Sequence, residues 1–345
     1  MPQRLTVVCP GDTAWSRYAL TLEHALRGHP ARIVTKITAP LQNQPILFAV
    51  PLDDSGVNHG YYDLLVYLRT HPGCLDGSVG GVLVDSPGDL YTKTVGRELV
   101  LSASRAGCAF PGRPLVEATG DLRNFTVQAK NASCSLEEAY GLAAADLVER
   151  VLDFATPKRR RPKLLVLHAS NHKTSNTLAL WSRCRERLAS ACDITQIGLR
   201  NGTLEDCAGC PYTMCLHYGE QGGCFYGGVM VREVYPAIRE ADAVVLLCPN
   251  YNDALSANLT ACVNRLTALF RQTRFYDKRL FGLVVSGYSG GDLLARQLIS
   301  ALNMNKSFFL PPHFCLLETA NERGSLIRLP GIRNTAAAFA KEMMQ

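Results

Sequence analysis

Residues 163–181 read KLLVLHASNHKTSNTLALW, and this stretch decides the fold. It opens with a continuous apolar run of the kind found in buried strands, and residues 176–188 continue with apolar side chains at helical spacing. The alternation returns downstream, in predicted strands at 193–199, 243–248 and 280–286 and predicted helices at 231–240 and 257–270. Helices between apolar strands indicate a doubly wound α/β fold, a parallel sheet covered on both faces.

The first half of the chain repeats this rhythm. It contains predicted strands at 5–9, 46–50, 81–85 and 114–118 and a closing helix at 135–154. Three strand-ending segments also resemble counterparts in the second half: residues 9–12 and 169–172, 86–89 and 248–251, and 118–120 and 285–287. We interpret these pairs as a duplication of one α/β domain. The alternative is that similar turns between strand and helix arose independently in the two halves.

A chain of 345 residues is long enough for two such domains. The basic run PKRRRPK at residues 157–163 has no interleaved aromatic residues, which indicates a solvated linker and not a nucleic-acid site. We therefore predict an N-terminal domain at 1–156, a linker at 157–163 and a C-terminal domain at 164–345.

The composition is typical of a globular protein, with 47% hydrophobic residues and a net charge of +6. No apolar run approaches the roughly 20 residues that a membrane span needs, and Met1 is not followed by a signal-peptide core, so we expect a cytoplasmic protein without membrane partners. Most of the 13 cysteines stand singly in apolar segments, as reduced core residues do.

Polar residues fill the loop HASNHKTSNT at 168–177, between the predicted strand and helix. Free backbone N–H groups and the positive end of the helix dipole make such a loop a cradle for phosphate. The loop lacks the glycines of a dinucleotide fingerprint and the Gly-Lys-Ser/Thr of a triphosphate loop. Simple helix capping is the alternative use of these residues.

Four cysteines, Cys207, Cys210, Cys215 and Cys224, follow within one short segment. Thiolates bind soft metals, so four in one loop match the ligation of a four-iron four-sulfur (4Fe-4S) cluster or of a structural zinc ion. Reduced thiols or a redox disulfide are the remaining alternatives.

Four segments in this order resemble the flavodoxin-like NAD(P)H-dependent FMN reductase family, and in particular its iron–sulfur flavoprotein branch. They are the loop at 168–177, CAGCPYTMC at 207–215 with Cys224, CPNYNDALSAN at 248–258 and SGYSGGD at 286–292. The resemblance covers roughly residues 163–300 and implies a flavodoxin-like fold for the second domain. Together with the internal repeat, it predicts two flavodoxin-like domains, of which the N-terminal one is a degenerate duplicate.

The resemblance also implies which residues bind FMN. The phosphate loop would supply Ser170, His172, Ser175, Asn176 and Thr177; the loop against the isoalloxazine ring would supply Pro249, Asn250, Tyr251 and Asn252; the loop at the pyrimidine edge would supply Ser286, Gly287, Tyr288 and Gly291. The four cysteines would hold the metal centre. In the first half, Asp12 and Trp15 replace the Ser/Asn/Thr series, which predicts a domain without flavin.

The expected function is that of an FMN-dependent oxidoreductase with NAD(P)H as electron donor and an iron–sulfur cluster that relays electrons to or from FMN. We expect a small-molecule electron acceptor and a homodimer in which the protomers cover each other's flavin. Two alternatives are an electron-transfer flavoprotein that docks a ferredoxin-like partner and a redox-sensing flavin-binding protein. No single catalytic residue is indicated by the sequence.

Overall fold

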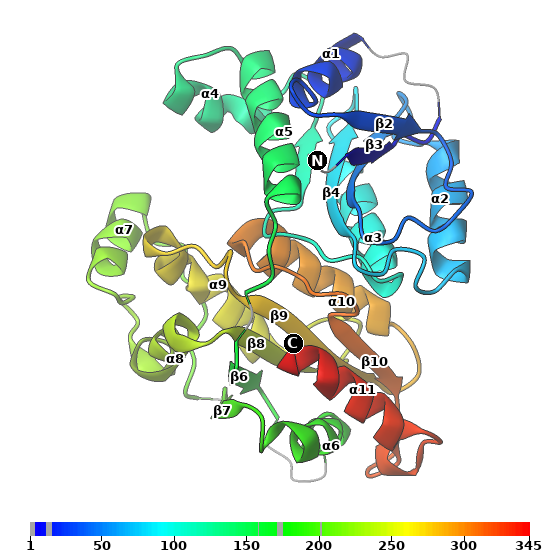
Figure 1. Cartoon of the computed structure of the whole chain (residues 1–345). Coiled ribbons are helices and arrows are strands. Elements are labelled where there is room, and N and C mark those ends of the chain that lie inside the picture. Colours follow the sequence, from blue (N-terminus) through cyan, green and yellow to red (C-terminus); the bar gives the residue numbers. More distant parts are fainter. Residues whose placement is uncertain (1–3, 12–15, 158, 171–174, 201) are drawn as a thin grey trace. The chain divides into compact units, whose positions relative to one another are not determined.

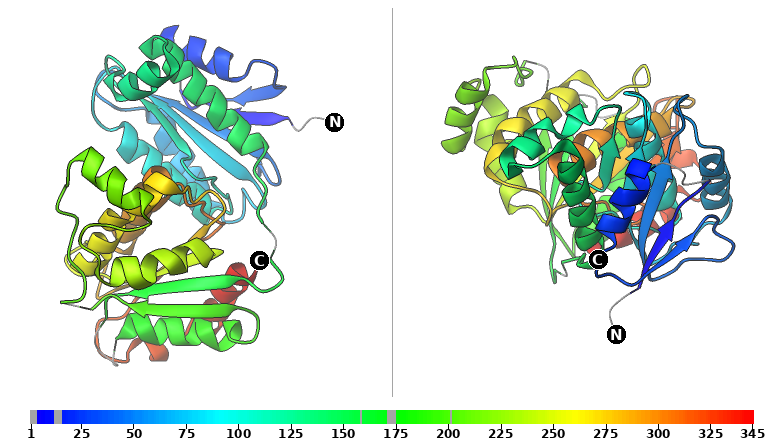
Figure 2. Two further views of the ribbon diagram at one scale, coloured as in Figure 1. Left: turned by 90° about the vertical axis from the view of Figure 1, so that its left-hand side faces the viewer. Right: turned by 90° about the horizontal axis from the view of Figure 1, so that it is seen from above.

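The computed structural model describes residues 4–11, 16–157, 159–170, 175–200 and 202–345. The chain divides into two compact units, Met1–Ala155 and Thr156–Gln345. Each unit is built on a five-stranded parallel sheet with helices on both faces (Figures 1 and 2). The prediction of two doubly wound α/β domains is therefore confirmed.

Unit 1 has the strand order β2-β1-β3-β4-β5. Its strands are β1 (Leu5–Val8), β2 (Ala31–Val34), β3 (Pro45–Pro51), β4 (Val79–Asp85) and β5 (Leu115–Ala118), and its helices are α1 (Ser16–Ala25), α2 (His59–Thr70), α3 (Thr92–Arg105), α4 (Thr126–Ala132) and α5 (Leu136–Leu152). Helices α1 and α5 pack together over one apolar core on one face of the sheet. A capping box between Ser135 and Glu138 starts α5, because each residue bonds the backbone N–H of the other.

Unit 2 has the strand order β10-β9-β8-β6-β7. Its strands are β6 (Lys163–His168), β7 (Asp193–Gly198), β8 (Ala243–Pro249), β9 (Arg279–Ser286) and β10 (Cys315–Thr319), and its helices are α6 (Asn176–Leu188), α7 (Tyr212–Glu220), α8 (Tyr235–Glu240), α9 (Ala257–Gln272), α10 (Gly291–Leu298) and α11 (Ile332–Met344). Single π-helical turns, Met230–Val234 and Ile299–Met304, precede α8 and extend α10. Helices α6 and α11 cover one face of the sheet, where the apolar core lies.

The two units share one topology. If the strands of each unit are numbered in chain order, their spatial order across both sheets is second, first, third, fourth, fifth. The third strand ends at Pro51 opposite Asp85 in unit 1 and at Pro249 opposite Val285 in unit 2. A lone parallel bridge also extends the start of the fourth strand in each unit, to Ala109 and to Phe309. These matches are what a duplicated domain produces.

One part of the predicted repeat is wrong by one strand. Residues 86–89 follow β4, the fourth strand of unit 1, whereas residues 248–251 follow β8, the third strand of unit 2. The third pair, 118–120 and 285–287, is displaced in the same way. The cause is β2, a short edge strand with exposed central residues, which lacks the apolar run of a buried strand and was not predicted.

The four cysteines lie in the connection that most distinguishes the two units. In unit 1 the second and third strands are joined by residues 35–44, which contain no helix. In unit 2 this connection is formed by residues 199–242. It contains α8 and the cysteine segment, which we define as residues 205–227 and which includes α7. The cysteine segment thus lies in the one crossover in which the two units differ most.

Candidate functional site

The three loops predicted to bind the cofactor leave the same edge of the sheet in unit 2. They follow β6, β8 and β9, which are neighbours in the order β9-β8-β6. The chain changes winding direction between β6 and β8, and ligands of open α/β sheets bind beyond the carboxyl ends of the strands at that point. The topology therefore gathers the loops where a ligand is expected.

The first loop is described only at its two ends. Ser170 is half-buried after β6, and the Ser175 hydroxyl caps α6 by accepting a hydrogen bond of 3.3 Å from the backbone N–H of Leu178. Thr177 is buried within the first turn of the helix. His172 lies outside the described residues. The assignment of this loop as a phosphate cradle stays a prediction, because the loop's centre is not described.

The side chain of Asn176 has protein partners for both of its polar atoms. Its Nδ2 donates to the carbonyls of Ala320 and Glu322 at 2.9 and 2.8 Å, and its Oδ1 accepts from the backbone N–H of Gly324 at 3.0 Å. These contacts attach the start of α6 to the loop after β10. Asn176 thus holds the start of α6 against the backbone of the loop after β10.

The second loop makes a tight turn after Pro249. Asn252 and Asp253 both have φ near +55°, and the backbone N–H of Ala254 bonds the Tyr251 carbonyl at 3.2 Å. Two consecutive left-handed residues define a type I′ turn, which Asn and Asp tolerate better than other side chains. Gln297 of α10 supports the turn from both sides, donating to the Asp253 carbonyl and accepting from the N–H of Leu255, each at 3.0 Å.

Asn250 connects the second loop to the third. Its Nδ2 lies 3.1 Å from the Ser286 hydroxyl, 2.9 Å from the Ser289 carbonyl and 3.1 Å from the Asp253 carboxylate. Its Oδ1 is buried and has no hydrogen-bond partner among the described residues. Asn250 therefore fixes the relative position of two predicted cofactor loops and leaves one amide acceptor for a ligand.

The third loop approaches the second so closely that glycine is required. Gly290 has φ +81°, and a Cβ at this position would lie 2.1 Å from an Asp253 carboxylate oxygen. Ser286 is buried at the end of β9, whereas the Tyr288 ring is 80% exposed. Gly287 precedes that tyrosine, and Gly291 is the first residue of α10. The structure thus brings all eight predicted residues of these two loops to one edge.

Sequence reasoning missed one loop of this edge. Asn321, just after β10, donates to the Tyr288 hydroxyl at 2.6 Å. Strand β10 is only partly buried and was not predicted, so the loop following it was not considered. Asn321 follows CLLETA at residues 315–320, where Glu318 and Thr319 interrupt the apolar run, so no strand-ending signal preceded it. Tyr251, 60% exposed, provides a second exposed ring at this edge.

His168 ends β6 directly before the first loop. Burial lowers the pKa of its imidazole; the backbone of Ser170 opposes this shift and the positive charge of Arg200 adds to it. The ring is consequently neutral at pH 7. His168 therefore belongs to the end of β6 at the switch point and not to the loop that follows it.

The four predicted metal ligands line one cavity of about 220 Å³. Cys207 is exposed and the other three cysteines are half-buried. Aromatic side chains of Tyr218, Phe225 and Tyr226 form part of the wall. The structure therefore brings together the four cysteines that the sequence singled out, and all four are free thiols.

Within the described residues, no three His, Cys, Asp or Glu side chains are close enough together to hold a metal ion. A structural zinc ion requires all four sulfurs at about 2.3 Å from one point. The four cysteines share the lining of the cavity with other side chains, and the described residues do not bring three ligands to one point.

Helix α9 forms the base of this cavity and holds the cysteine segment in place. The Asp206 carboxylate accepts from the backbone N–H of Cys207 at 2.6 Å and from the Asn264 side chain of α9 at 3.0 Å. Helix α7 contacts α9 at Gly219, where a Cβ would lie 3.0 Å from the Ala268 carbonyl. The segment is thus seated on a regular helix of unit 2.

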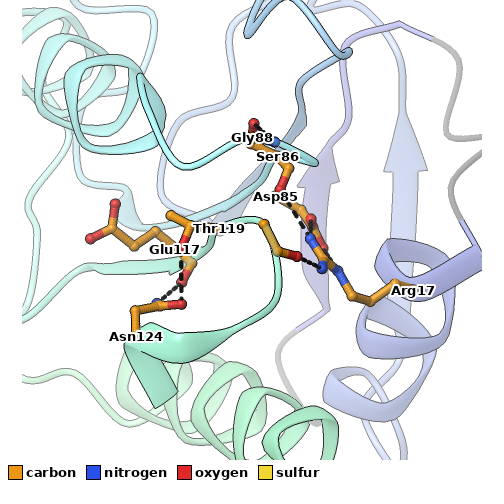
Figure 3. Close-up of polar contacts among 8 residues, drawn as sticks. Arg17, Asp85, Ser86, Gly88, Glu117, Thr119 and Asn124 are labelled. Atoms are coloured by element: carbon orange, nitrogen blue, oxygen red, sulfur yellow. Dashed lines mark hydrogen bonds and ion pairs between the residues drawn. The ribbon is translucent and has the colours of Figure 1, made fainter. Parts of the chain in front are cut away.

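The corresponding edge of unit 1 is occupied by the protein's own side chains (Figure 3). Arg17 pairs with both carboxylate oxygens of Asp85 and donates to the carbonyls of Ser86, at 3.1 Å, and Gly120, at 2.7 Å. Asp85 is 1% exposed and takes the place of Val285 in unit 2. Asp12 and Trp15, on which the prediction of a flavin-free domain was based, lie outside the described residues.

Unit 2 thus has the fold and the loop arrangement of a doubly wound nucleotide-cofactor domain. Residues 162–322 match the model of one family, described as NADPH-dependent FMN reductase. This match places the second unit among flavin-dependent oxidoreductases and confirms the prediction at that level. Among curated proteins, no sequence matches the chain.

Solved structures of similar fold include an NAD(P)H:quinone oxidoreductase from Methanothermobacter marburgensis, which is 15% identical with a TM-score of 0.39. The match covers 53% of this chain and 98% of the oxidoreductase chain. An azoreductase from Bacillus anthracis str. Sterne is 14% identical with a TM-score of 0.37 and covers 53% of this chain and 98% of its own. At such low identity these likenesses do not bear on the reaction. Among the described helices, none is both long and apolar enough to cross a membrane.

Proposed function

We propose that this protein is an NAD(P)H-dependent FMN oxidoreductase whose cysteine segment carries a four-iron four-sulfur cluster that exchanges electrons with the flavin. The observation that carries the proposal is the joint arrangement in unit 2. Three loops meet at the switch point of the sheet, and four cysteines line a separate cavity in the crossover after β7.

The loop residues fit FMN. The buried, unpartnered Asn250 Oδ1 offers an acceptor, the exposed rings of Tyr251 and Tyr288 offer aromatic faces, and the start of α6 offers the positive end of a helix dipole. Bound FMN would supply the chemistry, hydride acceptance from NAD(P)H and release of one or two electrons. The residues of the protein orient the flavin and exclude water from it.

The cysteine residues fit a cluster. The ligands of this cluster would be Cys207, Cys210, Cys215 and Cys224, because all four line one cavity. Cys207 is the most exposed of the four, so electrons would leave or enter the pocket near it. The alternatives are that the cysteines bind a structural zinc ion or remain free thiols.

Unit 1 fits a structural, flavin-free duplicate. Arg17 and Asp85 form an ion pair at its carboxyl edge, at the position where unit 2 has the apolar Val285. We propose further that two chains associate as a homodimer that covers the exposed flavin edge, and that a small-molecule electron acceptor binds there. The free thiols throughout the chain support a reducing compartment, the cytoplasm.

An electron-transfer flavoprotein that docks a ferredoxin-like partner is the second candidate. It is favoured by the exposed Cys207 and by the exposed Tyr212 ring beside Arg271, which together form a basic, aromatic surface next to the cavity. Rapid reduction by a ferredoxin with slow NAD(P)H oxidation would support this candidate. Rapid NAD(P)H oxidation with a small acceptor would support the oxidoreductase. Flavin binding without turnover would support a redox-sensing flavin-binding protein.

The decisive experiment is an anaerobic absorbance spectrum of the purified protein, with flavin, iron, zinc and acid-labile sulfide quantified on the same sample. We expect one FMN with about four irons and four sulfides per chain. Substitution of Cys210 by serine should remove iron and sulfide while FMN remains. Substitution of the buried Cys262, outside the cavity, is the matched control and should change neither content. Absence of flavin after reconstitution would contradict the whole proposal.

A further inference from the structure

Arg265 of α9 is a buried cation that joins the two ends of the cysteine segment. Its side chain is 2% exposed and lines the same cavity as the four cysteines. The guanidinium donates to the Gly227 carbonyl at 2.7 Å, after the last cysteine, and to the Glu205 carbonyl at 3.4 Å, before the first. Its Nε is buried and has no hydrogen-bond partner among the described residues.

Arg271, nearly two helical turns further along α9, contacts the cysteines directly. Its Nε lies 3.5 Å from the sulfur of Cys215 and donates a hydrogen bond to it. The guanidinium carbon lies 4.3 Å from the centre of the Tyr212 ring, and this stacking holds the group over the cavity. Arg271 is half-buried, so water screens its charge less than that of an exposed arginine.

The residues that line the cavity thus include two arginines, and the neighbouring Asp206 carboxylate is bonded to Asn264 and to the backbone of Cys207. No Asp or Glu lines it, and among the described residues no carboxylate forms an ion pair with Arg265 or Arg271. A buried cation destabilises the fold unless an opposite charge lies close to it. This destabilisation is offset when a negatively charged group occupies the cavity.

We infer that Arg265 and Arg271 are positioning residues for an anionic cysteine-held centre: Arg265 closes the cysteine segment around it, and Arg271 sets its reduction potential through Cys215. The inference rests on the proposed cluster. A cluster held by the four thiolates would be anionic, and its reduced form would carry one further negative charge. The hydrogen bond to a ligand sulfur and the adjacent positive charge both favour that reduced state.

The test for Arg271 is the midpoint potential of the cluster, measured by anaerobic redox titration of the full-length protein. R271Q should retain its iron and sulfide but shift the one-electron equilibrium about tenfold toward the oxidised cluster, a potential lower by about 59 mV. R271K should recover part of the shift because it keeps the charge. The matched control is R274Q, because Arg274 is an exposed cation that stacks on Phe270 outside the cavity.

The test for Arg265 is cluster retention. R265M should lose most of its iron and sulfide while keeping FMN, because both ends of the segment are released and α9 remains. R265K, which can still donate to one carbonyl, should retain more. FMN content and thermal unfolding of each variant show whether unit 2 is folded.

The outcomes separate the inference from the proposed function. An R271Q potential equal to that of the wild type and of R274Q, with the cluster bound, would overturn the role of Arg271 and leave the cluster standing. Full iron and sulfide content in R265M would overturn the role of Arg265 in the same way. Absence of iron and sulfide from the reconstituted wild-type protein would overturn both the cluster and the inference.

Discussion

The side-chain amide of Asn250 lies 3.1 Å from the hydroxyl of Ser286. These residues end adjacent strands, and the same amide also reaches Ser289 and Asp253. One short polar side chain therefore holds two cofactor loops in register at the switch point. The buried position of Ser286 makes this contact part of the scaffold and not a surface contact.

Substitution of Asn250 by alanine should weaken FMN binding and destabilise unit 2. A net loss of about 1 kcal/mol per hydrogen bond predicts a decrease of about 1–3 kcal/mol in the free energy of unfolding, together with a higher FMN Kd. Flavin fluorescence titration and denaturant unfolding measure the two effects. The matched control is Asn334→Ala, which removes an exposed side chain of α11, outside the three loops. An N250A protein with the wild-type FMN Kd would contradict the role given to Asn250.

Substitution of Gly290 by alanine should be more destructive than the same change at a free glycine. At Gly290 both the positive φ and a Cβ only 2.1 Å from the Asp253 carboxylate oppose a side chain. At Gly331, φ is +74° but nothing lies within 4 Å of the added Cβ. We expect a loss of roughly 1–2 kcal/mol for G331A and a clearly larger loss for G290A. Equal losses in denaturant unfolding would show that the two loops move apart at no cost.

The exposed tyrosines should matter for binding and not for folding. Tyr251→Ala and Tyr288→Ala should leave the free energy of unfolding within about 0.5 kcal/mol of wild type, since both rings are mostly exposed. Loss of an aromatic contact of about 0.5–1.5 kcal/mol predicts an FMN or acceptor affinity weakened roughly two- to tenfold. Tyr62→Ala, an exposed tyrosine of unit 1, is the control. Unchanged flavin and acceptor binding in both variants would place the flavin elsewhere.

Acid should destabilise unit 2 through His168. Because burial lowers its pKa below the ordinary value of 6.5, the unfolded chain binds a proton before the folded one does. The stabilisation is therefore fully present above pH 6.5 and is lost as the pH falls through the lower pKa of the folded state. His168→Gln should flatten this part of the stability curve. Parallel curves for variant and wild type between pH 7 and pH 5 would exclude His168 as the titrating group.

The ion pair of unit 1 should be structural. Asp85→Val alone leaves the Arg17 guanidinium without its carboxylate and should destabilise unit 1 by roughly 3–5 kcal/mol. The double variant R17M/D85V, which restores the valine found at this position in unit 2, should recover most of that loss. FMN content should be unchanged in both, because the pair does not belong to the proposed flavin site. A loss of FMN in the folded double variant would assign unit 1 a part in flavin binding.

The sequence predicted those elements whose signal is local. The apolar runs that became β6, β8 and β9 are buried over most or all of their length in the centre of the sheet, so their composition alone marked them. Two of the four edge strands, β2 and β10, were missed, because neither has the continuous apolar run of a central strand. The missed β2 also displaced the predicted repeat by one strand. Asn321 was missed together with β10 for the same reason.

The sequence by itself determined the fold class, the three polar loops and the set of four cysteines, because each of these depends on residue type and spacing along the chain. Only the tertiary structure decided which residues share a partner. It assigned Asn176 to the loop after β10, made Asn250 the link between two loops, and placed Arg265 and Arg271 beneath the cysteines. These contacts join residues tens of positions apart or more, and their energies depend on distance and burial, which no local pattern encodes.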